Sequence, residues 1–274
     1  MQQNRIDTAR ADENFPVASK LLPEPWRKPI LSFYSFVRGM DDISDSKSMS
    51  REEKRDELRR IRLALQEEQP EMLPSWAQGY YQRVSNNEFA KKHGDDLWKA
   101  FWRDTEKDRY RSFGEVMNYC KLSAVPVGRL VLEVSREIKP KLAAADALCS
   151  ALQLLNHLQD VRDDYRDLQR VYIPQDWLAD AGLSEKVLEK AETGPKLRSI
   201  FNLWLDEVDK LLRQAGHLPR SIRHRGLRWE LRIILAYARA LSRKLRKEDP
   251  MARRVKLGGF HRAVLGIGAV IGVC

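Results

Sequence analysis

Two acidic segments, far apart in the chain, constrain its fold more than any other feature. Asp41 and Asp45 in the first segment, and Asp160 and Asp164 in the second, are spaced i, i+4 within stretches that otherwise have the apolar pattern of core-facing helices. Like charges at this spacing cost an isolated helix about 0.2–0.5 kcal/mol. Burying them without a partner costs far more. The pattern therefore predicts buried helices whose acidic faces line a wet, cation-binding interior.

Each acidic face contains more than its Asp pair. At about 100° per residue, four residues of the first segment fall within an arc of about 60°, namely Tyr34, Arg38, Asp41 and Asp45. Four of the second fall within about 80°, namely Gln153, Asn156, Asp160 and Asp164. Two such faces, opposed across a helical bundle, predict an oxygen-lined site for Mg²⁺ and a phosphate-bearing ligand. The alternative is a structural ion network with neighbouring arginines. Asp42 lies off the first line and is a less certain ligand.

The rest of the chain predicts an all-α protein. Stretches rich in Leu, Ala, Glu, Lys and Arg lie between scattered prolines, with few alternating β-branched runs. We expect helices over 29–45, 51–66, 78–89, 95–108, 113–136 (interrupted at Pro126 and Gly128), 141–168, 184–214 and 221–246. The sequence contains no repeat or convincing linker, which favours a single helical domain over 14–250. Residues 1–13 are expected to be disordered, and 251–274 to form a basic, then apolar, tail.

The charge of the chain limits its partners. A net charge of +10 and a pI near 9.5 indicate an anionic partner: nucleic acid, an anionic membrane surface or a phosphorylated substrate. Nucleic acid is not expected, because the sequence has no zinc-ligand spacing and no basic–aromatic RNA motif.

The twelve uncharged residues 263–274 follow a basic stretch. As a helix they would span roughly 18 Å, too short for a bilayer core. They predict either a tail that seeks a membrane surface or one that is frayed or buried.

The expected compartment is the cytoplasm. Three scattered cysteines are too few for a disulfide framework, which favours a reducing environment. Residues 1–13 are polar and charged and do not have the pattern of a signal peptide.

Four segments in a fixed order resemble the squalene/phytoene synthase family. They are the first acidic segment, Tyr-Cys-Lys-Leu-Ser-Ala-Val-Pro-Val-Gly at 119–128, the second acidic segment and Arg-Val-Tyr-Ile-Pro at 170–174. The resemblance covers about 14–246. The segments Glu-Asn-Phe-Pro-Val-Ala-Ser at 13–19 and Ser-Ala-Val-Pro-Val-Gly-Arg at 123–129 are most similar to the bacterial hydroxysqualene synthase branch of hopanoid biosynthesis.

The resemblance implies a single-domain, isoprenoid synthase-like helical bundle with both acidic faces lining a central cavity. It implies a prenyl diphosphate substrate and Mg²⁺ held by Asp41, Asp45, Asn156, Asp160 and Asp164. It also implies diphosphate contacts from Arg38 and Arg170, with Gln153 nearby, and cavity walls shaped or polarised by Tyr34, Tyr119 and Tyr172.

Some residues depart from the family pattern. Arg162 and Asp163 stand where a small residue followed by Arg is expected, so a diphosphate contact from position 163 is in doubt. His157 stands where aromatic residues are common, and we interpret it as a packed residue or one that supports the site. Lys121 would supply a compensating charge to the substrate, or it is a solvated helix residue.

The function implied by the resemblance is Mg²⁺-dependent conversion of presqualene diphosphate to hydroxysqualene. Diphosphate ionisation, cation rearrangement and capture by water need no NADPH. A companion presqualene diphosphate synthase and peripheral attachment to the inner face of the bacterial membrane are expected. Three alternatives stay open at this point: a head-to-head prenyl transferase (squalene, presqualene diphosphate or phytoene synthase), a non-catalytic assembly factor on the same fold, and a binding protein that acts through its charge alone.

Overall fold

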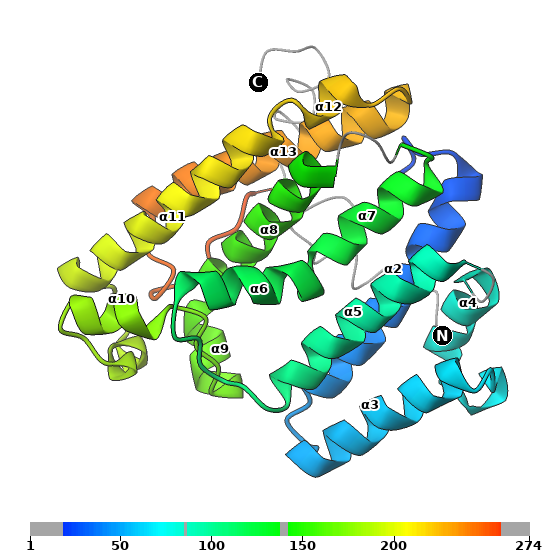
Figure 1. Ribbon diagram of the computed structural model, residues 1–274. Coiled ribbons are helices and arrows are strands. Elements are labelled where there is room, and N and C mark those ends of the chain that lie inside the picture. The colour runs from blue at the N-terminus through cyan, green and yellow to red at the C-terminus, as the bar shows by residue number, and fades with distance from the viewer. Residues whose placement is uncertain (1–18, 85–86, 138–141, 259–274) are drawn as a thin grey trace. The chain divides into compact units, whose positions relative to one another are not determined.

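The computed structural model describes residues 19–84, 87–137 and 142–258 (Figure 1). Within these ranges the chain forms α-helices and short 3₁₀ turns, with no β-strand beyond an isolated bridge between Arg109 and Val171. The prediction of an all-α protein is therefore confirmed. The expected disordered residues 1–13 and the apolar part of the expected tail lie outside the described residues.

The chain divides into two compact units. Unit 1 is Met1–Lys107 together with Pro126–Ile138, and unit 2 is Asp108–Val125 together with Lys139–Cys274. The domain limits expected from the sequence stay a prediction. The helices of unit 1 are α2 (Glu24–Ser44), α3 (Arg51–Gln66), η1 (Pro70–Met72), α4 (Ser75–Val84), α5 (Glu88–Asp104) and α7 (Val125–Val134), of which only the first residue belongs to unit 2. Those of unit 2 are α6 (Phe113–Ser123), α8 (Leu142–Gln159), α9 (Val161–Leu168), α10 (Gln175–Asp180), η2 (Glu185–Glu189), α11 (Pro195–Ala215), α12 (Leu218–Ser221) and α13 (Arg225–Lys247).

Unit 1 is built around α2, which packs against α3, α4 and α5. Phe36 and Met40 of α2 are fully buried, and the Phe36 ring stacks on Tyr80 of α4 with centroids 4.1 Å apart. The Trp76 ring of α4 lies directly over Gly39, which leaves no room there for a side chain. This packing fixes the helix that carries the first acidic segment.

The start of α2 differs from the sequence expectation. The expected helix began at Pro29, but α2 begins at Glu24, with Pro25 in its first turn and Pro29 inside the helix. Proline fits a first turn because the amide hydrogen that it lacks would have no intrahelical partner there. Pro29 is one turn further on, so the helix forgoes a hydrogen bond at that position.

Unit 2 is built around α8, which packs against α11, α6 and α13. Trp204 of α11 is buried, and its indole Nε1 donates a hydrogen bond to the Leu154 carbonyl of α8 at 2.9 Å. This hydrogen bond from a bulky side chain fixes the distance between α11 and α8 and the face that each helix turns to the other.

Three of the expected helices are divided in the structure. The one expected over 184–214 is replaced by η2 and by α11, which begins at Pro195. The division near Pro126 was expected from the sequence, and the one at Asp160 was not. The expected 113–136 helix divides into α6 and α7 at Ala124, two residues before Pro126, whose missing amide hydrogen cannot continue the α6 pattern. The expected 141–168 helix divides into α8 and α9 at Asp160, whose backbone lies at φ −100° and ψ 7°. The continuous helix expected over 141–168 is therefore wrong, because the helix is divided at Asp160.

Candidate active site

The first acidic segment lies at the end of α2, in unit 1, with Asp45 as the residue that follows the helix. Arg38 Nη1 donates to Asp41 Oδ2 at 2.9 Å, and Arg38 Nε lies 3.1 Å from Asp42 Oδ1. The hydroxyl of Ser44 donates to the Asp45 carboxylate at 3.3 Å. The structure thus brings Arg38 and Asp41 together, and it adds Asp42, which the helical periodicity placed off the polar line.

The electrostatics of this cluster centre on Asp41. Burial, followed by the negative charge of Asp45, raises the pKa of Asp41 to about 8, although Arg38 opposes the shift. Asp104, at the end of α5, also raises it. A cation beside these oxygens would relieve the repulsion, so the donor set fits a divalent metal ion. Tyr34 is half-buried on the same helix, one turn before Arg38.

The second acidic segment lies at the junction of α8 and α9, in unit 2. Gln153 and Asn156 are half-buried on the last two turns of α8, and Asp160 follows at the break. The Asp164 backbone amide donates to the Asp160 carbonyl at 2.7 Å, so the turn of chain continues through the break. The Asp164 carbonyl in turn accepts from the Arg170 amide at 3.0 Å, which ties the loop after α9 to the cluster.

The Asp160 carboxylate is paired with a residue that was not singled out from the sequence. Arg254 Nη2 donates to Asp160 Oδ2 at 2.9 Å, and its Nε contacts the other carboxylate oxygen. Burial raises the pKa of Asp160 above its ordinary value, although the Arg254 charge opposes the shift. The Arg254 guanidinium therefore stabilises the ionised form of Asp160, which burial alone would disfavour.

Arg254 is held in place by the segment that follows α13. Met251 and Val255 are buried, and the backbone carbonyls of both accept hydrogen bonds from the acidic segment, the first from Arg162 Nη1 at 2.9 Å and the second from Gln159 Nε2. Residues 251–258 are thus packed into unit 2, whereas the sequence analysis assigned them to a tail. The apolar spacing of Met251, Val255 and Leu257 is the signal from which this packing was predictable.

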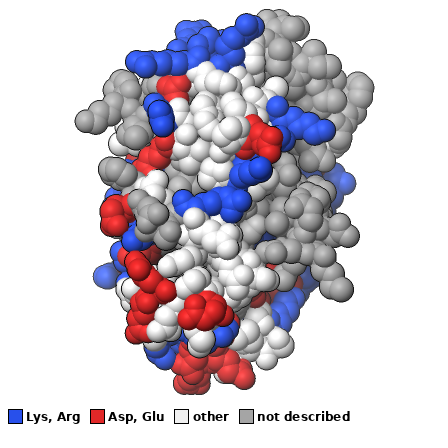
Figure 2. All heavy atoms as spheres, turned by 90° about the vertical axis from the view of Figure 1, so that its right-hand side faces the viewer, with Lys and Arg blue, Asp and Glu red and all other residues white. Residues whose placement is uncertain are grey.

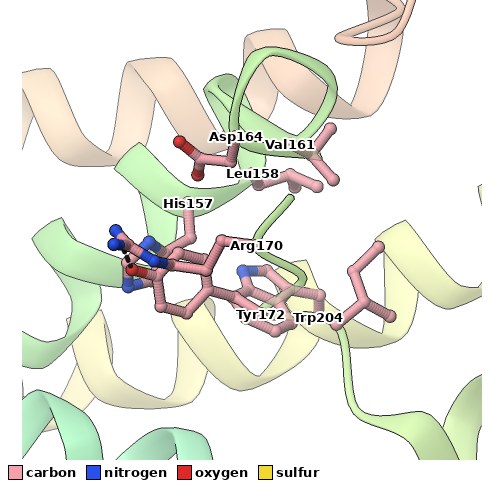
Figure 3. Close-up of a pocket in the computed structure, with 8 residues that line it drawn as sticks. His157, Leu158, Val161, Asp164, Arg170, Tyr172 and Trp204 are labelled. Atoms are coloured by element: carbon pink, nitrogen blue, oxygen red, sulfur yellow. Dashed lines mark hydrogen bonds between the residues drawn. The ribbon is translucent and has the colours of Figure 1, made fainter. Parts of the chain in front are cut away.

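A small pocket lies beside the second acidic segment (Figure 3). Eight residues line it: His157, Leu158, Val161, Asp164, Arg170, Tyr172, Ile173 and Trp204. In Figure 3, His157, Arg170 and Tyr172 are grouped on one side, while Val161 and Asp164 of α9 approach from the other. The pocket therefore joins one carboxylate and one guanidinium to a wall that is otherwise apolar and aromatic.

Tyrosines form the polar part of that wall. Arg170 Nη1 donates to the Tyr172 hydroxyl at 3.3 Å, and the Tyr172 hydroxyl donates to that of Tyr119 at 3.5 Å. The Tyr110 ring stacks on Tyr172 with centroids 5.4 Å apart. The structure thus brings together three residues singled out from the sequence, Arg170, Tyr172 and Tyr119, and it adds Tyr110, which no motif indicated.

His157 is part of the same wall. Its ring stacks on Tyr172 with centroids 3.5 Å apart and an angle of 20° between the planes. Burial, followed by the charge of Arg170, lowers the pKa of His157 to about 3, so the imidazole is neutral at physiological pH. Its Nε2 has no hydrogen-bond partner among the described residues.

Lys121 and Asp163 have exposed positions. Lys121 Nζ donates to Asn118 Oδ1 on its own helix at 3.0 Å, and Lys121 does not line the pocket described above. Asp163 lies 3.3 Å from Arg166 Nη2, one turn along α9. These contacts are those of solvated helix residues, which was the alternative interpretation for Lys121.

The described residues include no group of three or more His, Cys, Asp and Glu side chains arranged to hold a metal ion. This observation is compatible with Mg²⁺, which typically binds to one or two carboxylates, several waters and the phosphates of a substrate. Both acidic segments offer carboxylate oxygens of this kind. The donor sets therefore fit an ion that arrives with a diphosphate.

None of the helices in the described ranges is long and apolar enough to cross a membrane.

Comparison with known proteins identifies relatives of this chain. The sequence model of the squalene/phytoene synthase family matches residues 8–261. The hydroxysqualene synthase of Rhodopseudomonas palustris is 37% identical over 269 residues, which cover 97% of this chain and 90% of the relative. That of Sinorhizobium fredii is 35% identical over 271 residues, with the same coverage of both chains. The crystal structure of squalene synthase HpnC from Alicyclobacillus acidocaldarius matches with a TM-score of 0.73 at 25% identity, covering 90% of this chain and 94% of that one.

Proposed function

Because the chain belongs to the squalene/phytoene synthase family, we propose that this isoprenoid synthase converts presqualene diphosphate to hydroxysqualene in hopanoid biosynthesis. The similarity to two hydroxysqualene synthases over 97% of the chain carries the proposal. The presence of both Asp pairs supports it, because a diphosphate-ionising enzyme needs carboxylates to hold the metal.

The first step is departure of the diphosphate. Mg²⁺ would be held by two sets of oxygen ligands, Asp41 and Asp45 in one and Asn156, Asp160 and Asp164 in the other. The ion supplies charge neutralisation that makes the diphosphate a competent leaving group. Arg38 and Arg170 would hold its oxygens through the paired hydrogen bonds that guanidinium groups make with phosphate. That both acidic segments act on one diphosphate is inferred from family membership.

Arg254 has a place in this step. Its guanidinium contacts both oxygens of Asp160 and would compete with Mg²⁺ for them. If Asp160 were a metal ligand, the Arg254 guanidinium would be left to hydrogen-bond the diphosphate oxygens and add a second positive charge there.

The second step is rearrangement and capture of the carbocation. The aromatic rings of Tyr172 and His157 line the pocket and would stabilise a positive charge there, while Tyr110 stacks on Tyr172. Because the pKa of His157 is low, its ring adds no positive charge of its own to oppose the cation. Capture of the cation by water then gives the alcohol without a hydride donor. Arg170 and Tyr119 would orient the Tyr172 hydroxyl at the edge of this pocket.

Product analysis tests the proposal. We expect the protein to convert presqualene diphosphate to hydroxysqualene with Mg²⁺, whether or not NADPH is added. Formation of squalene that depends on NADPH would contradict the proposed product. Turnover of farnesyl diphosphate alone would instead favour the head-to-head prenyl transferase alternative.

The substrate and the product also bear on where the enzyme works. Both carry long hydrocarbon chains that partition into a bilayer, so we propose peripheral attachment to the inner face of the bacterial membrane. A companion presqualene diphosphate synthase would supply the substrate there. The net charge of +10 supports attachment to an anionic surface.

A further inference from the structure

The end of unit 2 formed by α12 and the start of α13 carries a concentration of arginine. Between residues 213 and 232 the sequence has six Arg against one acidic residue, a net charge of +5. The acidic residue is Glu230, which is buried. Four of the arginines are exposed, and three of these, Arg220, Arg223 and Arg225, lie within six residues of one another. We refer to these three residues together with Trp229 and Arg232 as the α12–α13 surface.

Figure 2 views the protein from the right-hand side of Figure 1. It shows Lys and Arg side chains gathered at the top of that face, at the height of α12 in Figure 1.

Two arginines of this surface, Arg220 and Arg225, differ in their bonding from the arginines of α3. On α3, Arg59 and Arg60 are paired with carboxylates one turn away, at 2.6 and 2.5 Å. By contrast, no carboxylate among the described residues lies within salt-bridge distance of Arg220 or Arg225. These two guanidinium groups are therefore available to an external anion.

The backbone beneath these arginines is fixed. Arg228 donates to the Ile222 carbonyl from Nε at 3.0 Å and from Nη2 at 2.8 Å. His224 caps the start of α13, with its Nδ1 accepting from the Leu227 amide at 3.3 Å. The loop between α12 and α13 is thus held in one conformation, so the exposed arginines project from a rigid base.

An aromatic side chain lies beside the charges. Trp229 is half-buried, and the guanidinium of Arg232 lies 4.6 Å from its ring centroid. Arg225, Trp229 and Arg232 are spaced i, i+4 and i+7, so they share one face of α13. A tryptophan flanked by basic residues is typical of surfaces at the boundary between lipid and water.

We propose that the α12–α13 surface docks the protein on an anionic phospholipid bilayer. The inference deepens the peripheral attachment proposed above and rests on it. Charge complementarity selects the partner: exposed guanidinium groups bind lipid phosphates through paired hydrogen bonds, while Trp229 lies at the level of the headgroups. Each arginine near an anionic membrane surface increases binding about fivefold, so the three exposed ones together contribute about 100-fold.

Vesicle binding by the full chain tests the docking surface. Co-sedimentation would be measured with phosphatidylcholine vesicles, with and without phosphatidylglycerol, for the wild type and for Arg220→Glu/Arg223→Glu/Arg225→Glu. The matched control, Lys186→Glu/Lys190→Glu/Lys196→Glu, reverses three exposed lysines of the same unit and changes the net charge equally. We expect the arginine variant to bind anionic vesicles at least about 100-fold more weakly than the wild type. The lysine variant should change by no more than about threefold.

Each result has a distinct meaning. Equal binding of wild type and arginine variant to anionic vesicles would overturn the α12–α13 surface but leave peripheral attachment standing. Failure of the wild type to bind would overturn both. Tighter wild-type binding to a single-stranded RNA than to anionic vesicles, lost in the arginine variant, would replace lipid with nucleic acid as the partner.

Two further measurements separate docking from folding and catalysis. Turnover of detergent-solubilised presqualene diphosphate should be unchanged in the arginine variant, whereas failure of the proposed reaction would abolish turnover in the wild type as well. If the charge-reversed variant does not fold, Arg220→Gln/Arg223→Gln/Arg225→Gln replaces it, with an expected loss of affinity of at least about tenfold.

Discussion

Replacing Asp41 by Asn should stabilise the protein at alkaline pH when Mg²⁺ is removed by a chelator. The carboxyl lies in the first acidic segment, where burial and Asp45 raise its pKa to about 8 from an ordinary value of 3.8. An amide at the same position keeps the shape of the side chain and carries no charge. The substitution therefore isolates the free-energy cost of ionising this group.

The pH dependence has a definite sign. Between about pH 4 and pH 8, Asp41 keeps its proton in the folded protein, while the unfolded chain has lost it. The folded state binds more protons in this window, so the free energy of unfolding falls as pH rises. The contribution of Asp41 to stability is fully present below pH 4 and is lost above pH 8. An amide at this position does not titrate, so the advantage of the variant should grow with pH.

The size of the effect follows from the pKa and the exposure. The difference between about 8 and 3.8 sets an upper limit of ~6 kcal/mol. The Asp41 side chain is 33% exposed, and solvent at such positions screens most of this energy. We therefore expect the Asn variant to be more stable by about 1–2 kcal/mol above pH 8, and its Tm to rise by about 3–6 °C.

Thermal unfolding followed by circular dichroism in chelator, near pH 5 and above pH 8, measures this difference. Asp56→Asn is the control, because the Asp56 side chain is 72% exposed and pairs with Arg59 on the same helix. It should change Tm little at either pH. A lower Tm for Asp41→Asn above pH 8, or an equal change at both pH values, would refute the reasoning.

Two further predictions concern packing and catalysis. Gly39→Ala should lower the free energy of unfolding by about 1–3 kcal/mol in a urea titration, because its Cβ would lie 2.3 Å from the Trp76 ring. The control Gly79→Ala, with 3.7 Å to the nearest atom, should raise it by about 1 kcal/mol through helix propensity. Asp160→Asn should lower kcat by about 100-fold or more in a diphosphate-release assay. Unchanged kcat would contradict its proposed role, as would an equal loss in the exposed control Asp163→Asn.

Local features of the fold were predictable from the sequence. The helix expected over 51–66 is α3 with the same limits, because Ser50 and Glu53 form a capping box whose partners are three residues apart. The contact between Arg38 and Asp41 follows in the same way from i, i+3 spacing on one helix. The all-α class required only the helical periodicity of the apolar residues.

Contacts between distant residues were outside the reach of periodicity. The sequence singled out Tyr119 and Tyr172 through family motifs, but their hydroxyl contact depends on how the loop after α9 packs near α6. The same pattern predicted one helix over 141–168, since the apolar residues continue in register through Asp160. The division of the helix at Asp160 does not disturb the spacing of the apolar residues, so this spacing could not reveal it.

Arg254 shows the physical reason most clearly. It is 94 residues from Asp160 in the chain, yet the two side chains form a charge-assisted hydrogen bond. The sequence alone identified the carboxylate, since its neighbours mark it as buried and acidic. Which cation neutralises that carboxylate was decided by burial of Met251 and Val255, which carries the end of the described chain back to α8. Side-chain spacing along a helix is local chemistry, whereas the partner of a buried charge is selected by the packing of the whole unit.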